Sequence, residues 1–282
     1  MNFLKKIIIV LIFLFPISNS FGAMVTHNQT VEYETGGMIA GVAFNADGTK
    51  VFTTYALTTF VNEYNLSTPY DISTKTYAGD SERCELLDSI ANALYDLEFS
   101  SDGMRLFILT RNSGSADADG DKVFGFDLTS AYDVSTCTLA SETTDLDSDT
   151  YAVGSLAGTP TTEHRKHKLQ GVEINDDGTK LFLVWADGND ADVGARLLEY
   201  TLSTPYDLTT LSLVTTAGIK FDGLGASGSN ENVQNPAGMR FSANGKRIFI
   251  ISHNDATAGI TQYSFTNAFD TSSFTADGYL NI

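Results

Sequence analysis

Basic residues are scarce in this sequence of 282 residues, which has 17 Lys and Arg against 35 Asp and Glu and a formal charge of −18. A surface with this excess of negative charge repels phosphate backbones, so we expect no nucleic-acid partner. The excess suits cations and cationic ligands. It also favours plain solubility in an extracellular setting.

The signatures of several enzyme classes are absent. The sequence has no G-x-S-x-G nucleophile elbow, no H-E-x-x-H zinc motif and no phosphate-binding P-loop. The glycine-rich run Gly223–Gly228 is followed by no predicted helix, so we interpret it as a loop. These absences favour a binding protein, although they leave an enzyme open.

Long apolar runs are missing after Ile17, so we predict no membrane span in the mature chain. The start carries Lys5 and Lys6, an apolar run over Ile7–Ile17, and small residues at Ser20 and Gly22. This order is typical of a secretory signal peptide, with a membrane anchor as the alternative. We predict a signal peptide over 1–22, one domain over 23–282, and a secreted or periplasmic location.

A two-part motif occurs four times. Its first half reads VAFNADGTKVFT (Val42–Thr53), LEFSSDGMRLFI (Leu97–Ile108), VEINDDGTKLFL (Val172–Leu183) and MRFSANGKRIFI (Met239–Ile250). Its second half reads VNEYNLSTPYD (Val61–Asp71), VFGFDLTSAYD (Val123–Asp133), LLEYTLSTPYD (Leu197–Asp207) and ITQYSFTNAFD (Ile260–Asp270). Repeats of this kind predict a propeller or another β-repeat array.

Each copy predicts four strands. An Asp-Gly or Asn-Gly pair, such as Asp47–Gly48, favours a turn between the first two strands. The second strand follows at once, for example over Lys50–Tyr55, and the fourth strand begins near Lys75. We expect the corner aspartates, such as Asp71, to accept hydrogen bonds from nearby backbone N–H groups.

The sequence therefore predicts an all-β β-propeller of four long four-stranded blades, with repeats at about 36–80, 91–141, 168–217 and 235–282. The alternative is seven shorter blades, three of them degenerate. The DGTKLF-type turn and the Tyr-x-Leu-Ser-Thr strand end resemble the YVTN and WD-like β-propeller repeat families. This resemblance implies the fold, and it leaves function open because propellers host binding, scaffolding and catalysis. Gln29–Thr35 is strand-like and could pair with the last blade.

The sequence has two cysteines: Cys84 follows the last strand of the first repeat, and Cys137 begins the last strand of the second. An exported protein can form a disulfide, so this pair is a candidate bridge. Its formation depends on a Cα–Cα separation that the sequence does not fix.

The connections between the second and third strands, and between successive repeats, are long and differ in every copy. In a propeller these connections share one face, which we predict to be the recognition face. Two of them are acidic and are candidate Ca²⁺ loops, with solvated carboxylates as the alternative. Their candidate ligands are Asp117, Asp119 and Asp121 in the first loop, and Asp187, Asp190 and Asp192 in the second.

Three histidines, His164, His167 and His253, also fall on the predicted recognition face. They are candidate ligand-binding residues, and a transition-metal site is a further interpretation. Arg165 and Lys166 separate the first two histidines and oppose a cation, which favours solvated loop histidines instead.

One position in the first strand breaks the apolar pattern, because its four copies are Ala43, Glu98, Glu173 and Arg240. The first strand is innermost in a propeller blade, so we expect these side chains to approach the central channel. Glu98, Glu173 and Arg240 could bind a polar ligand there. The interpretation that we favour is that they pair with one another.

The leading functional hypothesis is a secreted, non-enzymatic module with no catalytic residues and no required cofactor. It would recognise a protein, glycan or other surface ligand through the long loops, with Ca²⁺ as a candidate structural ion. The alternatives are a metal-assisted hydrolase of lactonase-like type and a structural component of the cell envelope.

Overall fold

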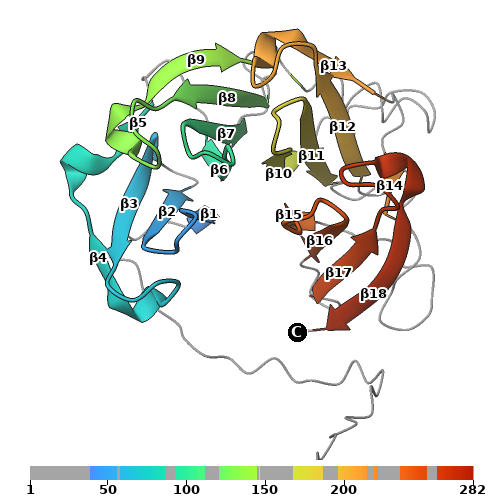
Figure 1. Cartoon of the computed structure of the whole chain (residues 1–282), viewed down its shortest axis with the longest axis horizontal. Helices are drawn as coiled ribbons and strands as arrows, with labels where there is room; N and C mark the ends of the chain where they lie inside the picture. The colour runs from blue at the N-terminus through green and yellow to red at the C-terminus, as the bar shows by residue number, and fades with distance from the viewer. Residues whose placement is uncertain are drawn as a thin grey trace, which may run out of the picture.

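The computed structural model describes residues 39–55, 58–86, 93–111, 121–144, 146, 168–186, 196–214, 219–221, 236–252 and 259–281. Regular structure in these residues consists of β-strands and short 3₁₀ turns. The strands form four antiparallel sheets that stand around a common centre (Figure 1). The fold is a four-bladed β-propeller, which confirms the predicted class and blade number.

Each blade is a meander whose strands follow one another from the centre to the rim (Figure 1). The first blade holds β1 (Ile39–Phe44), β2 (Lys50–Tyr55), β3 (Phe60–Leu66), β4 (Lys75–Tyr77) and β5 (Cys84–Glu85). The second holds β6 (Ala93–Phe99), β7 (Arg105–Arg111), β8 (Lys122–Asp127) and β9 (Thr138–Glu142). The third holds β10 (Lys168–Ile174), β11 (Lys180–Ala186), β12 (Arg196–Leu202), β13 (Leu211–Leu213) and β14 (Ile219–Lys220). The fourth holds β15 (Pro236–Phe241), β16 (Arg247–Ser252), β17 (Gly259–Ser264) and β18 (Thr275–Asn281).

The 3₁₀ turns lie at the rim. They are η1 (Ile72–Thr74), η2 (Asp80–Glu82), η3 (Val134–Thr136), η6 (Leu208–Thr210) and η7 (Thr271–Ser273). The short strands β5 and β14 pair with β3 and β12 beside the predicted outer strands, and the repeat pattern did not predict them. The strand predicted at Gln29–Thr35 lies outside the described residues.

The turn between the first two strands depends on its glycine. In the third blade Gly178 has a φ of 70°, and its N–H donates to the carbonyl of Asn175 at 2.9 Å. The carboxylate of Asp177 accepts from the N–H of Thr179 at 3.1 Å. Glycine takes this left-handed conformation without the steric cost that a Cβ brings, which is why Asp-Gly or Asn-Gly recurs here.

The aromatic corner residue packs on this turn. Tyr206 has a φ of 64°, an unusual conformation for a residue with a Cβ, and the equivalent residues of the other blades share it. Its N–H donates to the carbonyl of Gly178 at 2.8 Å. A Cβ added to Gly178 would lie 2.5 Å from the Tyr206 ring, so the ring rests directly on the glycine. Turn and corner therefore stabilise one another across the blade.

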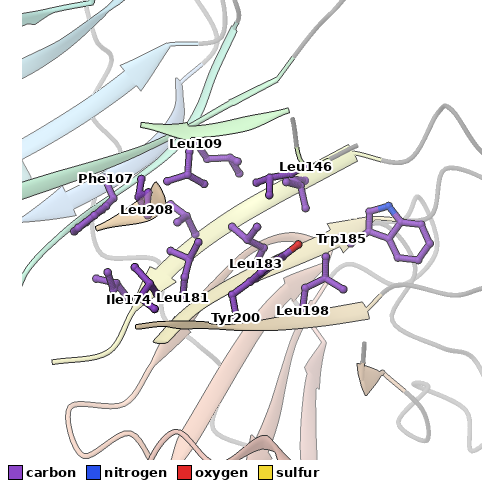
Figure 2. Packing of buried hydrophobic residues seen from close by; sticks show 14 residues of the cluster. Phe107, Leu109, Leu146, Ile174, Leu181, Leu183, Trp185, Leu198, Tyr200 and Leu208 are labelled. Carbon is purple, nitrogen blue, oxygen red and sulfur yellow. The ribbon is translucent and has the colours of Figure 1, made fainter. Parts of the chain in front are cut away.

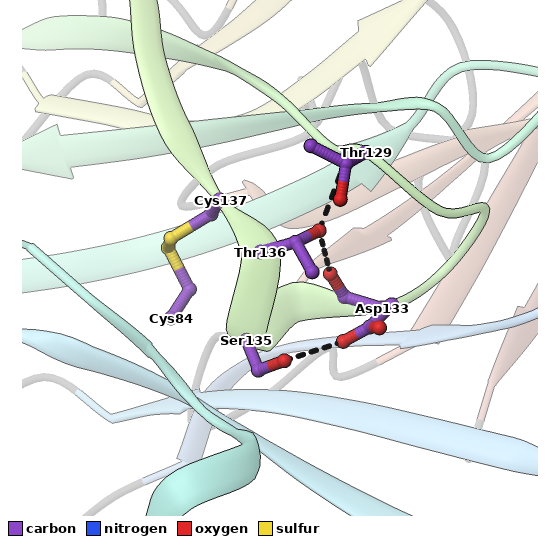
Figure 3. Close-up of a disulfide and its surroundings, with 6 residues drawn as sticks. All are labelled: Cys84, Thr129, Asp133, Ser135, Thr136 and Cys137. Carbon is purple, nitrogen blue, oxygen red and sulfur yellow. Dashed lines mark hydrogen bonds between the residues drawn. A yellow bond between two sulfur atoms is a disulfide. The ribbon is translucent and has the colours of Figure 1, made fainter.

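The corner aspartates act as predicted in three blades. Asp71, Asp207 and Asp270 each accept from the backbone N–H two residues later. Asp133 instead accepts from the hydroxyl of Ser135 at 2.6 Å (Figure 3). In both cases the carboxylate orders the entry into a 3₁₀ turn.

The hydrophobic core lies between the blades. Figure 2 shows the cluster between the second and third blades, which includes Phe107 and Leu109 of the second and Leu183 and Tyr200 of the third. Similar clusters join the first blade to the second and the third blade to the fourth. A sheet that is covered on both faces reads as a continuous apolar run, and the second strand of each blade has this composition.

A disulfide joins the rims of the first two blades. Cys84 begins β5 and Cys137 follows η3, with a Cα–Cα distance of 5.7 Å (Figure 3). The sequence left this pairing open, and the packing of neighbouring blades brings the cysteines together. They are 53 residues apart in the sequence. A bridge over such a loop removes unfolded-state entropy worth about 4 kcal/mol at 25 °C.

Replacing Gly178 with alanine is expected to lower the free energy of unfolding by at least ~2 kcal/mol. The added Cβ meets the ring of Tyr206, and the backbone there has a positive φ. Urea denaturation of the purified protein measures the change. Gly238→Ala is the control, because Gly238 has no positive φ and no heavy atom within 4 Å of the added Cβ. Equal losses in the two variants would contradict this explanation of the turn.

Candidate functional site

The inner strands β1, β6, β10 and β15 surround the centre of the ring (Figure 1). Each carries a register shift at the same place in the repeat, between Ile39 and Gly41, Leu94 and Asp96, Leu169 and Gly171, and Pro236 and Gly238. A β-bulge of this kind re-aims the side chains that follow it. The position that follows these bulges is the one occupied by Ala43, Glu98, Glu173 and Arg240.

Arg240 connects all four inner strands. Its Nη1 donates to carboxylate oxygens of Glu98 and of Glu173, the latter at 2.7 Å. Its Nη2 donates to the carbonyl oxygens of Val42 and Leu97, both at 3.1 Å. The structure therefore brings Glu98, Glu173 and Arg240 together as a mutually paired group. We call these three residues, with Asp96, the axial cluster.

Asp96 belongs to the axial cluster and was missed by the sequence analysis. One carboxylate oxygen accepts from the N–H of Leu97 at 2.9 Å, and the other accepts from the N–H of Val172 in the next blade at 3.0 Å. Its carboxylate also lies 4.0 Å from Nη2 of Arg240. A signal was present in the repeats, because the other three copies have glycine where this copy has aspartate.

The axial cluster is partly accessible. The side chains of Asp96 and Glu173 are 10% and 8% exposed, whereas those of Glu98 and Arg240 are 23% and 38% exposed. Glu98 is thus the carboxylate that solvent reaches most easily. Three carboxylates surround one guanidinium, so full ionisation would leave an excess of negative charge.

Burial shapes the protonation of the cluster. It raises the pKa of Asp96 to about 6 and that of Glu98 to about 7, while the charge of Arg240 opposes both shifts. Burial, followed by the charge of Glu98, raises the pKa of Glu173 well above its usual value. The cluster therefore shares protons near neutral pH, and its titration belongs to the group rather than to single residues.

Most of the predicted loop residues lie outside the described residues. These are His164, His167, His253, Asp117, Asp119, Asp187, Asp190 and Asp192. Asp121 is described and is 4% exposed, and its carboxylate accepts from the N–H of Leu169 in the next blade at 3.0 Å. This hydrogen bond gives Asp121 a structural contact, and the predicted Ca²⁺ loops stay a prediction.

Within the described ranges no three His, Cys, Asp or Glu residues are grouped so that they could hold a metal ion. In the axial cluster the guanidinium of Arg240 occupies the position among the carboxylates that a cation would take. In the same part of the chain no helix is long and apolar enough to cross a membrane.

Comparison with known proteins supports the fold. No family model matches the sequence, and no curated protein matches it. A protein from Lactobacillus plantarum is 13% identical with a TM-score of 0.51, and the match covers 87% of this chain and 56% of that one. A candidate 6-phosphogluconolactonase from Bacteroides uniformis is 14% identical with a TM-score of 0.48, covering 87% and 55%. A β-propeller domain from Myceliophteria thermophila is 10% identical with a TM-score of 0.41, covering 86% and 58%.

The chain therefore spans little more than half the length of these structures. The likeness to the Lactobacillus plantarum protein, at 13% identity and a TM-score of 0.51, concerns the fold alone. What the chain binds or does has to be argued from its own residues.

The axial cluster predicts a fall in stability between about pH 5 and pH 7. The carboxyl pKa values are higher in the folded than in the unfolded state, so the folded protein binds more protons across this range. We expect the free energy of unfolding to fall by ~2 kcal/mol over the range, and less in Glu98→Gln. Urea titrations at several pH values measure it.

Glu85→Gln is the matched control for this experiment, because Glu85 is an exposed carboxylate on β5 at the rim. It is expected to show the pH profile of the unmodified protein. A Glu98→Gln profile as steep as that of the control would contradict the raised pKa of Glu98.

Proposed function

We propose that this chain is an exported binding module whose axial cluster holds a cationic or hydroxyl-rich group of its ligand. The observation that carries the proposal is the ratio of three carboxylates to one guanidinium at a partly exposed position on the axis. Excess carboxylates are hydrogen-bond acceptors, and they are satisfied best by a donor or a positive charge.

The hydrogen bonds of Arg240 support this choice of ligand. Both terminal nitrogens already donate, Nη1 to Glu98 and Glu173 and Nη2 to Val42 and Leu97. Little of the guanidinium is left for an anion. An amine, a guanidinium or a sugar hydroxyl would instead find acceptors on Glu98, the most exposed carboxylate of the cluster.

The net charge of the protein supports the same ligand class. A formal charge of −18 attracts cations and repels anions on approach, within about a Debye length at physiological salt. The long connections that differ between the repeats would add contacts around the axis and select among ligands. Export follows from the predicted signal peptide over 1–22.

A binding screen tests the proposal. Peptides, amino sugars and neutral glycans would be titrated into the mature protein at 0.15 M salt, where nonspecific attraction is screened. We expect Glu98→Gln to lower the affinity for the tightest-binding ligand by about tenfold or more, because a charge-assisted hydrogen bond is lost. Glu85→Gln is expected to bind as the unmodified protein does. Equal affinity in both variants would place the ligand away from the axis and overturn the proposal.

A lactonase-like hydrolase is the second candidate, and the pKa of Glu98 favours it. A carboxyl with a pKa of about 7 is suited to proton transfer near neutral pH. Glu98 would take a proton from water as the water oxygen adds to the lactone carbonyl carbon. The ring C–O bond would then break, and the leaving alkoxide would receive the proton.

Hydrolysis of glucono-δ-lactone above the spontaneous rate, measured with and without added divalent metal, tests this candidate. We expect Glu98→Gln to lower the catalysed rate by about 100-fold and Glu85→Gln to leave it unchanged. A metal requirement would favour a metal-assisted hydrolase. Turnover no faster than buffer would remove the candidate. The structural, cell-envelope interpretation stays a prediction.

A further inference from the structure

Arg111 is a buried cation with no hydrogen-bond partner among the residues that the structure describes. It is the last residue of β7 and is 5% exposed. Its Nε has no hydrogen-bond partner, and no salt bridge joins Arg111 to any described residue. Its guanidinium makes a cation–π contact with Tyr95, whose ring centroid lies 3.8 Å from the guanidinium carbon. Burying a guanidinium costs several kcal/mol unless its N–H groups find acceptors.

The ring that backs Arg111 belongs to an apolar cluster. Its partner Tyr95 packs against the cluster between the second and third blades, which includes Leu109, Leu146 and Leu169 (Figure 2). Asp121 is the carboxylate that acts on Arg111 electrostatically, although it lies beyond salt-bridge distance. Burial lowers the pKa of Arg111, and Tyr95 and then Asp121 only partly offset this.

The propeller scaffold does not require an arginine here. In the repeat alignment the equivalent residues are Ala56, Ala186 and His253, so the other blades are built without a guanidinium at this position. Arg111 also lies at the end of β7 that leads into a long connection, on the predicted recognition face. Both facts separate Arg111 from the repeated core.

We propose that Arg111, backed by the ring of Tyr95, is a binding site for a small oxyanion, a carboxylate or a phosphate. A guanidinium offers five N–H donors in a planar fork that matches two oxygens of either group. Burial of Arg111, which is 5% exposed, strengthens such a pair because it limits competing water. This site is separate from the axial cluster and does not depend on the function proposed above.

The test is the thermal stability of the mature protein in phosphate, acetate or chloride at constant ionic strength. A ligand that binds only the folded state raises the melting temperature. We expect phosphate, acetate or both to raise it by about 2–4 °C relative to chloride at saturation. A response to one oxyanion alone identifies its class, and a response to both identifies a general oxyanion site.

Arg111→Leu is expected to abolish the response and to leave the protein folded, since an apolar residue replaces an unpaired buried charge. Arg83→Leu is the matched control. Arg83 stacks on the ring of Phe60 at 4.1 Å but already pairs with Asp80 at 3.2 Å, so its loss should leave the oxyanion response unchanged.

Two results would overturn the proposal. One is an equal rise in Arg111→Leu, which would reflect the general effect of these salts on protein surfaces. The other is no response of the unmodified protein to either oxyanion. Lower stability of Arg111→Leu in chloride would then make Arg111 a structural residue.

Discussion

The guanidinium of Arg240 meets the other three inner strands at the centre of the ring. It donates to the carbonyl of Val42 on β1, to Leu97 and Glu98 on β6, and to Glu173 on β10. Because one planar group makes all these contacts, the four inner strands are held in one arrangement. The carboxylates are in turn held close together by the cation that they share.

This polar contact matters most between the fourth and first blades. Three hydrophobic clusters each join consecutive blades, whereas in the described part of the chain the fourth cluster, around Val51, Tyr64 and Leu66, stays within the first blade. The hydrogen bond from Arg240 to Val42 therefore links two blades that share none of these apolar clusters. In the proposed function the axial cluster would join stability to binding, because the residues that connect the blades are also those that we propose to contact the ligand.

The first and third repeats differ from the second in how the basic residue at the start of the second strand contacts the next blade. Lys50 in the first blade and Lys180 in the third each pair with a glutamate of their own blade at 2.7 Å. Each also donates to the corner carbonyl of the next blade, Tyr132 at 3.3 Å and Phe269 at 2.8 Å. Arg105 in the second blade instead lies over the ring of Tyr206, with its guanidinium carbon 5.2 Å from the centroid. Equivalent positions thus join the blades by different chemistry, and the differences leave room for functional residues.

The features that depend only on neighbouring residues could be predicted from the sequence. The Asp-Gly turns, the bounds of β2 and the corner aspartates follow from backbone preferences that act over a few residues. The repeat also showed that Glu98, Glu173 and Arg240 occupy one position. The packing of the blades was needed to show that Asp96 joins them and that Arg111 is buried against Tyr95 with no salt bridge to a described residue. Contacts such as that between Arg240 and Val42 join residues far apart in the chain, and burial and pKa depend on which blades pack together.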